Sequence, residues 1–250
     1  MPWFEPPLLA VLRHEYAASM RFAEDDAAEV MPAAPATACQ LYVHVPFCET
    51  LCPFCSFHRV RVNPAKTGRY FDALRREIGL YHDAGFRFAD VYVGGGTPTV
   101  DSEQLLQTLA CIGARSPVRS ISIETNPNHL EPAMLRRWRD AGVTRLSVGV
   151  QSFDDALLGR MERLDKYGSG AVIAERLAAA AGILPTLNVD MIFNLPGQTM
   201  AMLERDLDRL LALGVDQVSF YPLMTAPSAR HAMQRSMGLA DTRLRHAMYE

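Results

Sequence analysis

From Leu41 onward, short β-branched runs alternate with longer amphipathic segments, and this alternation constrains the fold more than any other feature of the sequence. The longer segments space apolar side chains three and four residues apart, which is typical of helices. Strands are predicted over residues 41–45, 90–93, 119–124, 145–150, 186–193 and 217–221. Strands joined through helices pair in parallel, because each helix returns the chain to the same edge of the sheet. The sequence therefore predicts an α/β fold with a mostly parallel sheet.

One face of these predicted strands is polar or small, as in Tyr42 with His44 and Ser122 with Glu124. Strands buried in a parallel sheet are usually apolar on both faces. A closed eight-stranded barrel also fills its interior with branched apolar side chains. A polar inner face instead favours a partial, open (βα)6 TIM-like barrel with a usable lumen. A sheet whose polar face is simply solvated is the alternative.

The first 40 residues differ in character from the rest of the chain. Apolar spacing over residues 8–22 predicts a helix, and the Pro/Ala stretch at 31–38 predicts a linker. We expect two parts: residues 1–40 as an N-terminal helix and linker, and residues 41–250 as the core. The opening residues carry no positive stretch before an apolar run, so we expect no secretory signal.

Charge and hydropathy narrow the classes of partner. The 25 basic and 28 acidic side chains give a net charge of −3, which removes the simple electrostatic case for nucleic acid or anionic membrane. No apolar run approaches the roughly 18 residues that span a bilayer. Five cysteines are too few for a disulfide scaffold. We therefore expect a cytoplasmic protein, in whose reducing compartment a cysteine cluster more often binds metal.

Three cysteines, Cys48, Cys52 and Cys55, have C-x3-C-x2-C spacing directly after the first predicted strand. Active sites of barrel folds lie at this end of the strands. A structural zinc site needs four ligands. The candidates for a fourth ligand are Cys39, His44 and His58. An iron–sulfur cluster with three cysteine ligands would instead leave one iron open. The spacing favours such a cluster, with structural zinc as the alternative.

The string CETLCPFC at 48–55 resembles the signature of radical S-adenosylmethionine (SAM) enzymes. The wider string YVHVPFCETLCPFCSF at 42–57 resembles the branch of oxygen-independent coproporphyrinogen III oxidase, and the resemblance extends over about residues 41–224. It implies that the three cysteines hold a [4Fe–4S] cluster whose open iron binds the amino and carboxylate groups of SAM. The reduced cluster would cleave SAM to methionine and a 5′-deoxyadenosyl radical, which abstracts a substrate hydrogen. A tetrapyrrole substrate and an electron donor such as flavodoxin or ferredoxin are implied as well.

The resemblance also assigns SAM contacts to residues in separate motifs. One motif is the loop GGGTPT at 94–99, where glycines let the backbone approach a ligand closely. The implied SAM-binding residues are Tyr42, Phe54, Gly95, Gly96, Thr97, Glu124, Gln151, Arg163, Asp190 and Met224. A carboxylate buried at Asp190 needs donors, which ribose hydroxyls would supply. The structural alternatives are a tight turn for the glycines, a helix-surface position for Arg163 and core packing for the aromatic residues.

Two departures from the oxidase pattern bear on the substrate. Phe57 stands two residues after Cys55, where the oxidases have a further cysteine, and Asn194 replaces a common glycine. The alternatives are a haem chaperone without turnover and a radical methyltransferase of natural-product biosynthesis. Family members continue with more barrel wall and a C-terminal domain, so we expect a truncated chain that ends within a helix at 241–249. Cys39 and Cys111 are expected to be structural.

Overall fold

The computed structural model describes residues 32–224, 229–240 and 247–249. The predicted helix at 8–22 lies outside these residues, as does most of the one at 241–249. The compact unit that contains the sheet spans residues 34–250, and the predicted boundary at residue 41 stays a prediction. Among the described residues, no helix combines the length and apolar character needed to cross a membrane.

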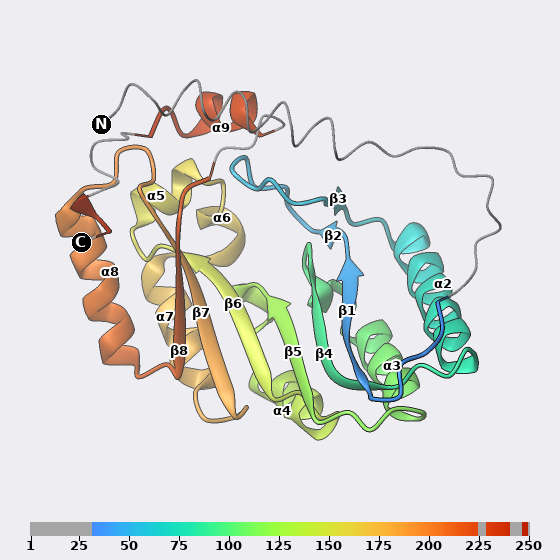
Figure 1. The fold of residues 1–250 in the computed structure, drawn as a ribbon. Coiled ribbons are helices and arrows are strands. Elements are labelled where there is room, and N and C mark those ends of the chain that lie inside the picture. The colour runs from blue at the N-terminus through green and yellow to red at the C-terminus, as the bar shows by residue number, and fades with distance from the viewer. Residues whose placement is uncertain (1–31, 225–228, 241–246, 250) are drawn as a thin grey trace, which may run out of the picture. The chain divides into compact units, whose positions relative to one another are not determined.

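A single six-stranded parallel sheet forms the centre of this unit (Figure 1). Its strands follow chain order: β1 (Cys39–Val45), β4 (Phe88–Gly95), β5 (Ser120–Thr125), β6 (Arg145–Gln151), β7 (Thr186–Phe193) and β8 (Gln217–Pro222). Within the described chain β1 and β8 are the two edges, so the sheet is open. The predicted strands and partial barrel are confirmed. Several strands are longer than predicted, because the parallel ladder continues past the β-branched runs.

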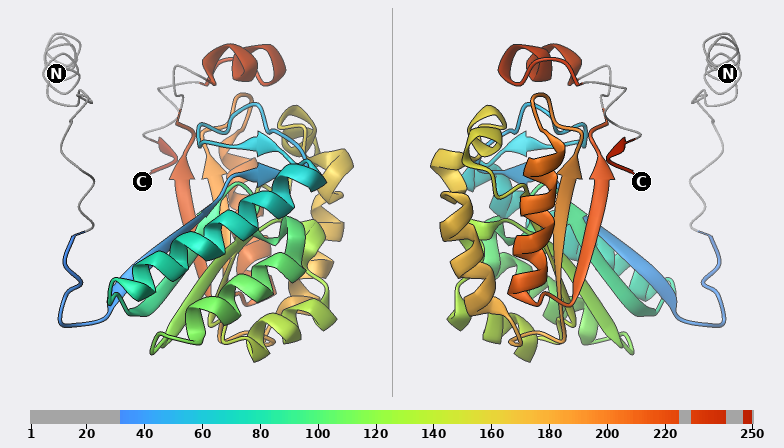
Figure 2. Two further views of the ribbon diagram at one scale, coloured as in Figure 1. Left: turned by 90° about the vertical axis from the view of Figure 1, so that its right-hand side faces the viewer. Right: turned by 90° about the vertical axis from the view of Figure 1, so that its left-hand side faces the viewer.

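Helices cover one side of the sheet and leave its other side as the inner face (Figures 1 and 2). The longer helices are α2 (Pro64–Asp83), α3 (Ser102–Gly113), α4 (Pro132–Asp140), α7 (Gly170–Ala180) and α8 (Met200–Leu213). Shorter elements are α5 (Asp155–Arg160), α6 (Leu164–Tyr167), α9 (Arg230–Ser236), η1 (Pro98–Asp101) and η2 (Pro127–His129). A small parallel pair, β2 (Phe47–Cys48) and β3 (Val60–Arg61), follows β1.

Side-chain caps set where several helices begin. The Asp101 carboxylate accepts a hydrogen bond from the Gln104 amide over 3.1 Å at the start of α3. Thr199 caps α8 in the same way, with its hydroxyl 3.3 Å from the Met202 amide. Pro132 occupies the first turn of α4, where its missing N–H leaves no helical bond unmade. Local sequence therefore sets the residue at which each of these three helices begins.

The core lies between the sheet and the helices. Branched strand residues such as Val43, Val93, Ile123 and Val189 are at most 2% exposed there. Each such side chain contributes roughly 1.5–3 kcal/mol when buried. The opposite face keeps the polar side chains, as the alternation predicts. Because the helix side supplies the apolar core, the inner face is free to form a site.

Candidate cofactor site

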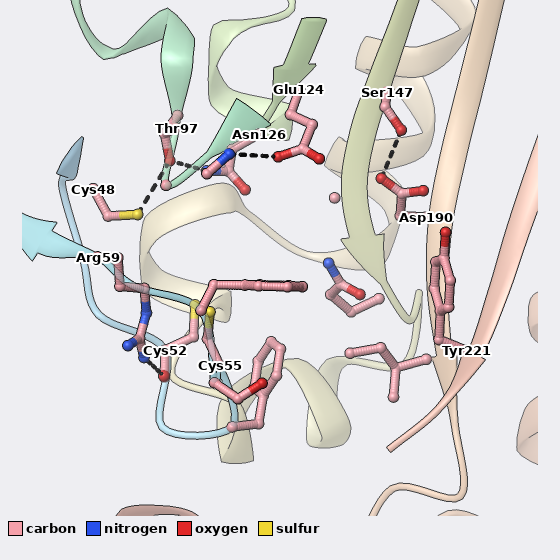
Figure 3. Close-up of a pocket in the computed structure, with 18 of the residues that line it drawn as sticks. Cys48, Cys52, Cys55, Arg59, Thr97, Glu124, Asn126, Ser147, Asp190 and Tyr221 are labelled. Carbon is pink, nitrogen blue, oxygen red and sulfur yellow. Dashed lines mark hydrogen bonds between the residues drawn. The ribbon is translucent and has the colours of Figure 1, made fainter. Parts of the chain in front are cut away.

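A cavity of about 340 Å³ opens at the carboxyl ends of the strands, the edge where parallel α/β folds bind ligands (Figure 3). The three motif cysteines line it. The other predicted residues that line it are Phe54, Gly95, Gly96, Thr97, Glu124, Gln151, Arg163, Asp190 and Met224. Residues from β2, from β4 to β8 and from their loops thus converge on one volume.

Tyr42 is the one predicted residue outside the lining of this cavity. Its hydroxyl lies 2.9 Å from Nδ1 of His44, and its ring stacks on Tyr92 with a centroid distance of 6.1 Å. Phe54, which lies within the cysteine loop, is 9% exposed, whereas Met224 is 61% exposed. The assignment of these three residues to SAM, like that of the other predicted residues, stays a prediction.

The cysteine loop holds its thiols at the cavity with backbone and side-chain bonds. Cys48 ends β2, and the Cys55 amide donates to the Cys52 carbonyl over 3.2 Å. Arg59 donates to that carbonyl as well. Burial raises the pKa of the Cys48 and Cys55 thiols. Since thiolates are the metal ligands, a metal cluster that binds here must displace the thiol protons.

Two of the three residues proposed as a fourth zinc ligand, Cys39 and His44, have other partners. The Cys39 thiol faces the carbonyl of Thr37, and both ring nitrogens of His44 lie near acceptors or donors: the Tyr42 hydroxyl and, at 3.2 Å, the His58 carbonyl. In the part of the chain that the structure describes, no three His, Cys, Asp or Glu side chains converge on a position for one ion. Ligands of a multi-iron cluster bind separate irons and need not converge in this way.

Arg163 is buried beside the thiols, with 3% of its surface exposed, so the helix-surface alternative is wrong. Its Nη1 donates to the Cys52 sulfur over 3.3 Å, and the guanidinium carbon lies 4.2 Å from the ring centre of Tyr167. Among the described residues, no carboxylate lies within ion-pair distance of it, and its Nε has no hydrogen-bond partner. A buried cation without a counter-ion is costly. Such a group therefore favours an anionic ligand.

A chain of hydrogen bonds joins two of the cysteines across the cavity, and Figure 3 shows its part from Cys48 to Asn126. The Thr97 hydroxyl donates to the Cys48 sulfur over 3.5 Å and accepts from the Asn126 amide over 2.8 Å. The Asn126 carbonyl accepts from Arg163 over 3.2 Å, and Arg163 completes the chain at Cys52. Four segments of the chain thus fix the positions of two sulfurs.

Asn126 is a site residue that the sequence motifs missed. The alternation of β5 contains the information, since Ser122, Glu124 and Asn126 occupy every second position. Arg59 and Arg145 also line the cavity and were not predicted. Neither lies in the cysteine or glycine motifs, and only the folded chain brings them to the site.

Glu124 is a half-buried carboxylate with two donors from β4. Its Oε1 accepts from the Tyr92 hydroxyl over 2.7 Å, and its Oε2 accepts from the Gly95 amide over 3.1 Å. Burial raises the pKa of Glu124, and the charge of Asp190 across the cavity raises it further. Each oxygen has one donor, which leaves lone pairs for a ligand in the cavity.

Asp190 faces the cavity from β7, and protein donors already meet its charge. Ser147 donates to Oδ2 over 2.7 Å and Asn188 donates to Oδ1 over 2.8 Å. Burial raises the pKa of Asp190, while these donors and the nearby Arg145 guanidinium oppose that shift. Protein groups therefore already donate to the Asp190 carboxylate without a bound ribose. Its remaining lone pairs can still accept from ribose hydroxyls.

The glycine loop needs its glycines for close approach. Gly95 has a φ of 119°, and a Cβ there would lie 2.7 Å from the His44 ring. A Cβ at Gly96 would lie 2.7 Å from the Phe47 carbonyl oxygen. The amides of Gly95, Gly96 and Thr97 already donate, over 2.7–3.1 Å, to Glu124, to the last carbonyl of β1 and to the first carbonyl of β2. Carbonyl oxygens are therefore what the loop can offer a ligand.

Gln151 reaches the cavity through an irregular strand end. The β6–β7 register shifts between Gly149 and Gln151, and Gln151 has a φ of 77°. Positive φ is uncommon for a residue other than glycine and concentrates at functional sites. A Cβ on Gly149 would lie 2.9 Å from Nε2 of the Gln151 side chain, so the glycine makes room for this side chain.

Comparison with known proteins agrees with this geometry. The sequence matches the radical SAM superfamily over residues 42–220. It is 34% identical over 193 residues to the heme chaperone HemW of Bacillus subtilis, covering 74% of this chain and 50% of that protein. It is 30% identical over 201 residues to the oxygen-independent coproporphyrinogen III oxidase of Cereibacter sphaeroides, covering 77% and 44%.

A solved structure is also similar. The coproporphyrinogen III oxidase HemN from Escherichia coli, a radical SAM enzyme, matches with a TM-score of 0.74 and 29% identity over 84% of this chain and 51% of that one. The chain spans about half the length of these relatives. The superfamily match covers well over half of the 250 residues. The chain therefore belongs to the radical SAM superfamily, in the branch of HemW and coproporphyrinogen III oxidase.

Proposed function

We propose that Cys48, Cys52 and Cys55 ligate three irons of a [4Fe–4S] cluster and that the adjoining cavity binds SAM. One observation carries the proposal: a buried guanidinium, Arg163, lies against the thiols with no carboxylate partner among the described residues and with Nε unbonded. Thiolates and a ligand carboxylate would supply the missing negative charge. When bound, the reduced cluster and SAM supply a one-electron cleavage whose radical product abstracts a hydrogen from substrate.

The two charged ends of the SAM amino acid match the groups around the cysteines. The free Nε of Arg163 is a donor suited to the carboxylate of SAM. The loop at Gly95 and Gly96 has committed its amides, so its carbonyls can accept from the ammonium group. Glu124 adds a carboxylate close to that loop. Acceptors and a cation thus stand where an ammonium and a carboxylate would bind.

The remainder of the cavity suits a nucleoside. Asp190 keeps lone pairs free to accept from ribose hydroxyls, and Gln151 can donate or accept beside it. Phe54 and Met224 add apolar surface to the lining, which an adenine ring would cover. A volume of about 340 Å³ lies in the range of small-molecule sites.

The names of the relatives support a proposal for the substrate class. Coproporphyrinogen III oxidase, the heme chaperone HemW and anaerobilin synthase are all names of relatives of this chain. We propose a tetrapyrrole as the molecule that approaches the cavity. All five cysteines are free thiols, which suits the cytoplasm and a small protein electron donor such as flavodoxin or ferredoxin.

A haem chaperone without turnover is the second candidate. Relatives named HemW are 32–36% identical to this chain. Phe57, at the position where the oxidase pattern has a cysteine, is 68% exposed and also lines the cavity. An exposed aromatic ring at the mouth suits contact with a flat macrocycle better than a further thiol ligand would.

The test is anaerobic incubation of the reconstituted protein with SAM and a chemical reductant, with and without coproporphyrinogen III or haem. The proposal predicts 5′-deoxyadenosine that depends on Cys52, so Cys52→Ser abolishes it and Cys111→Ser does not. Haem binding without 5′-deoxyadenosine selects the chaperone. S-adenosylhomocysteine with a methylated product selects a methyltransferase. If the protein forms no cluster and does not cleave SAM, the proposal is contradicted.

A further inference from the structure

A second hollow, of about 660 Å³, lies at the surface between α2 and the β2–β3 pair, and we call it the α2 groove. Figure 2 shows α2 along the outside of the sheet, with β2 and β3 beyond its first turns. Apolar side chains, including Phe47 and Val60, form one part of its lining. The basic residues of the lining are Lys66, Arg69 and Arg76. The α2 groove therefore combines an apolar floor with a basic rim.

The positive charge of the groove is uncompensated. Lys66, Arg69 and Arg76 are exposed, and none of them has a carboxylate within ion-pair distance among the residues that the structure describes. Asp72 also lines the groove, but its carboxylate pairs with Arg75 over 2.5 Å. The full chain carries a net charge of −3, so this positive patch is local rather than general.

Arg61 extends the basic patch toward the cysteine loop. It is exposed, and in the β2–β3 ladder it pairs with Cys48. Val60 beside it is 41% exposed and pairs with Phe47. The short β2–β3 pair thus places one cysteine of the candidate cluster directly beside a basic, partly apolar surface.

The groove floor is adjacent in sequence to the candidate cluster. Phe47 immediately precedes Cys48, and its ring packs edge-to-face on Tyr70 with a centroid distance of 5.3 Å. The Phe47 carbonyl accepts from the Thr97 amide over 2.7 Å, and the Thr97 hydroxyl donates to the Cys48 sulfur. A molecule seated in the groove would therefore have a short covalent and hydrogen-bonded path to Cys48.

We propose that the α2 groove docks an acidic, flavin-containing protein that carries one electron and reduces the cluster. The inference rests on the proposed function, since it needs a cluster at the three cysteines. One electron leaves the reduced carrier and enters the cluster, lowering the charge of the cluster by one, and no bond forms or breaks. A basic rim steers an acidic partner and raises its association rate, and an apolar floor lets the two surfaces exclude water.

The test compares two double charge reversals of equal net charge. Lys66→Glu/Arg69→Glu reverses the groove rim near the start of α2, where acidic residues suit the helix. Arg136→Glu/Arg205→Glu reverses two exposed arginines on α4 and α8 as the control. The measurements are binding of oxidised flavodoxin to each protein and the rate at which reduced flavodoxin or photoreduced 5-deazariboflavin reduces the reconstituted cluster.

The groove reversal should weaken flavodoxin binding and slow reduction by flavodoxin at least ~10-fold at low salt, with the difference shrinking at high salt. Reduction by deazariboflavin, which is small and uncharged, should stay unchanged, and so should the control variant. Equal losses in both double variants, or no loss in the groove variant, would overturn the docking surface. If no cluster forms but groove-dependent, salt-sensitive binding persists, the proposed function fails and the docking surface stands.

Discussion

Arg163 Nη1 lies 3.3 Å from the sulfur of Cys52, although the two residues are 111 positions apart in the sequence. The contact ties the loop before α6 to the cysteine loop after β1 and places a buried cation beside the thiols. Its orphaned Nε points to a further anionic partner.

Replacing Arg163 with lysine keeps the charge and removes the planar set of donors that reaches Cys52, Asn126 and a ligand carboxylate. We expect Arg163→Lys to weaken SAM binding about 10-fold, which corresponds to roughly 1.4 kcal/mol, measured by equilibrium titration of the reconstituted protein. Arg160→Lys, at an exposed position three residues away, is the matched control. Equal SAM affinity in wild type and Arg163→Lys would remove Arg163 from the site.

The pKa of Glu124 is raised in the folded state by burial, which gives the pH dependence of stability a definite sign. Above its ordinary value of 4.5, the unfolded chain releases this proton more readily than the folded chain. The free energy of unfolding of the ligand-free protein should therefore fall as pH rises through this region, and Asp190 acts in the same direction. Glu124→Gln should flatten that fall in melting experiments from about pH 4 to 7.

A control variant and a SAM-binding measurement accompany the Glu124→Gln experiment. Glu204→Gln, which alters an exposed carboxylate of α8, should leave the pH profile as it is in wild type. The Glu124→Gln protein should also bind SAM more weakly, because a neutral amide attracts an ammonium less than a carboxylate does. A steeper fall of stability with pH in Glu124→Gln would contradict the account.

Glu49, between two cluster cysteines, anchors the loop to a neighbouring segment. Its Oε2 accepts from Lys166 over 2.8 Å and from Asn128 over 3.0 Å. Glu49→Gln should cost about 1 kcal/mol of unfolding free energy and speed the loss of iron to a chelator, because the loop loses its charged tether. Glu103→Gln, which breaks the exposed pair with Arg137, should leave iron loss unchanged. Iron loss at the same rate in both variants would show that the tether does not hold the loop.

Periodic patterns predicted the sheet because they depend on neighbouring residues alone. Alternation along β5 and β6 determines which side chains face the helices, and β7 begins and ends at the predicted residues, 186 and 193. Strand ends were less predictable, because ladders such as β1–β4 extend through Cys39 and Gly95, residues without strand preference.

The site was predictable where its chemistry lies in contiguous motifs, as for the cysteines and the glycine loop. Contacts between distant segments were not predictable, because they depend on the whole fold; examples are the bond from Asn126 to Thr97 and that from Arg163 to Cys52. Tyr42 differs from the other predicted residues: its ring stacks on Tyr92, outside the cavity lining, and its contact with SAM stays a prediction.

The most direct test of the central claim is the metal content of the purified, anaerobically reconstituted protein and of its single cysteine variants. Wild type, Cys39→Ser and Cys111→Ser should each contain about four irons with matching sulfide per chain. Each should also show a broad absorbance at roughly 400 nm. Cys48→Ser, Cys52→Ser and Cys55→Ser should each lose most of that iron. Zinc without iron or sulfide in the wild-type protein, or full iron content in any of those three variants, would contradict the central claim.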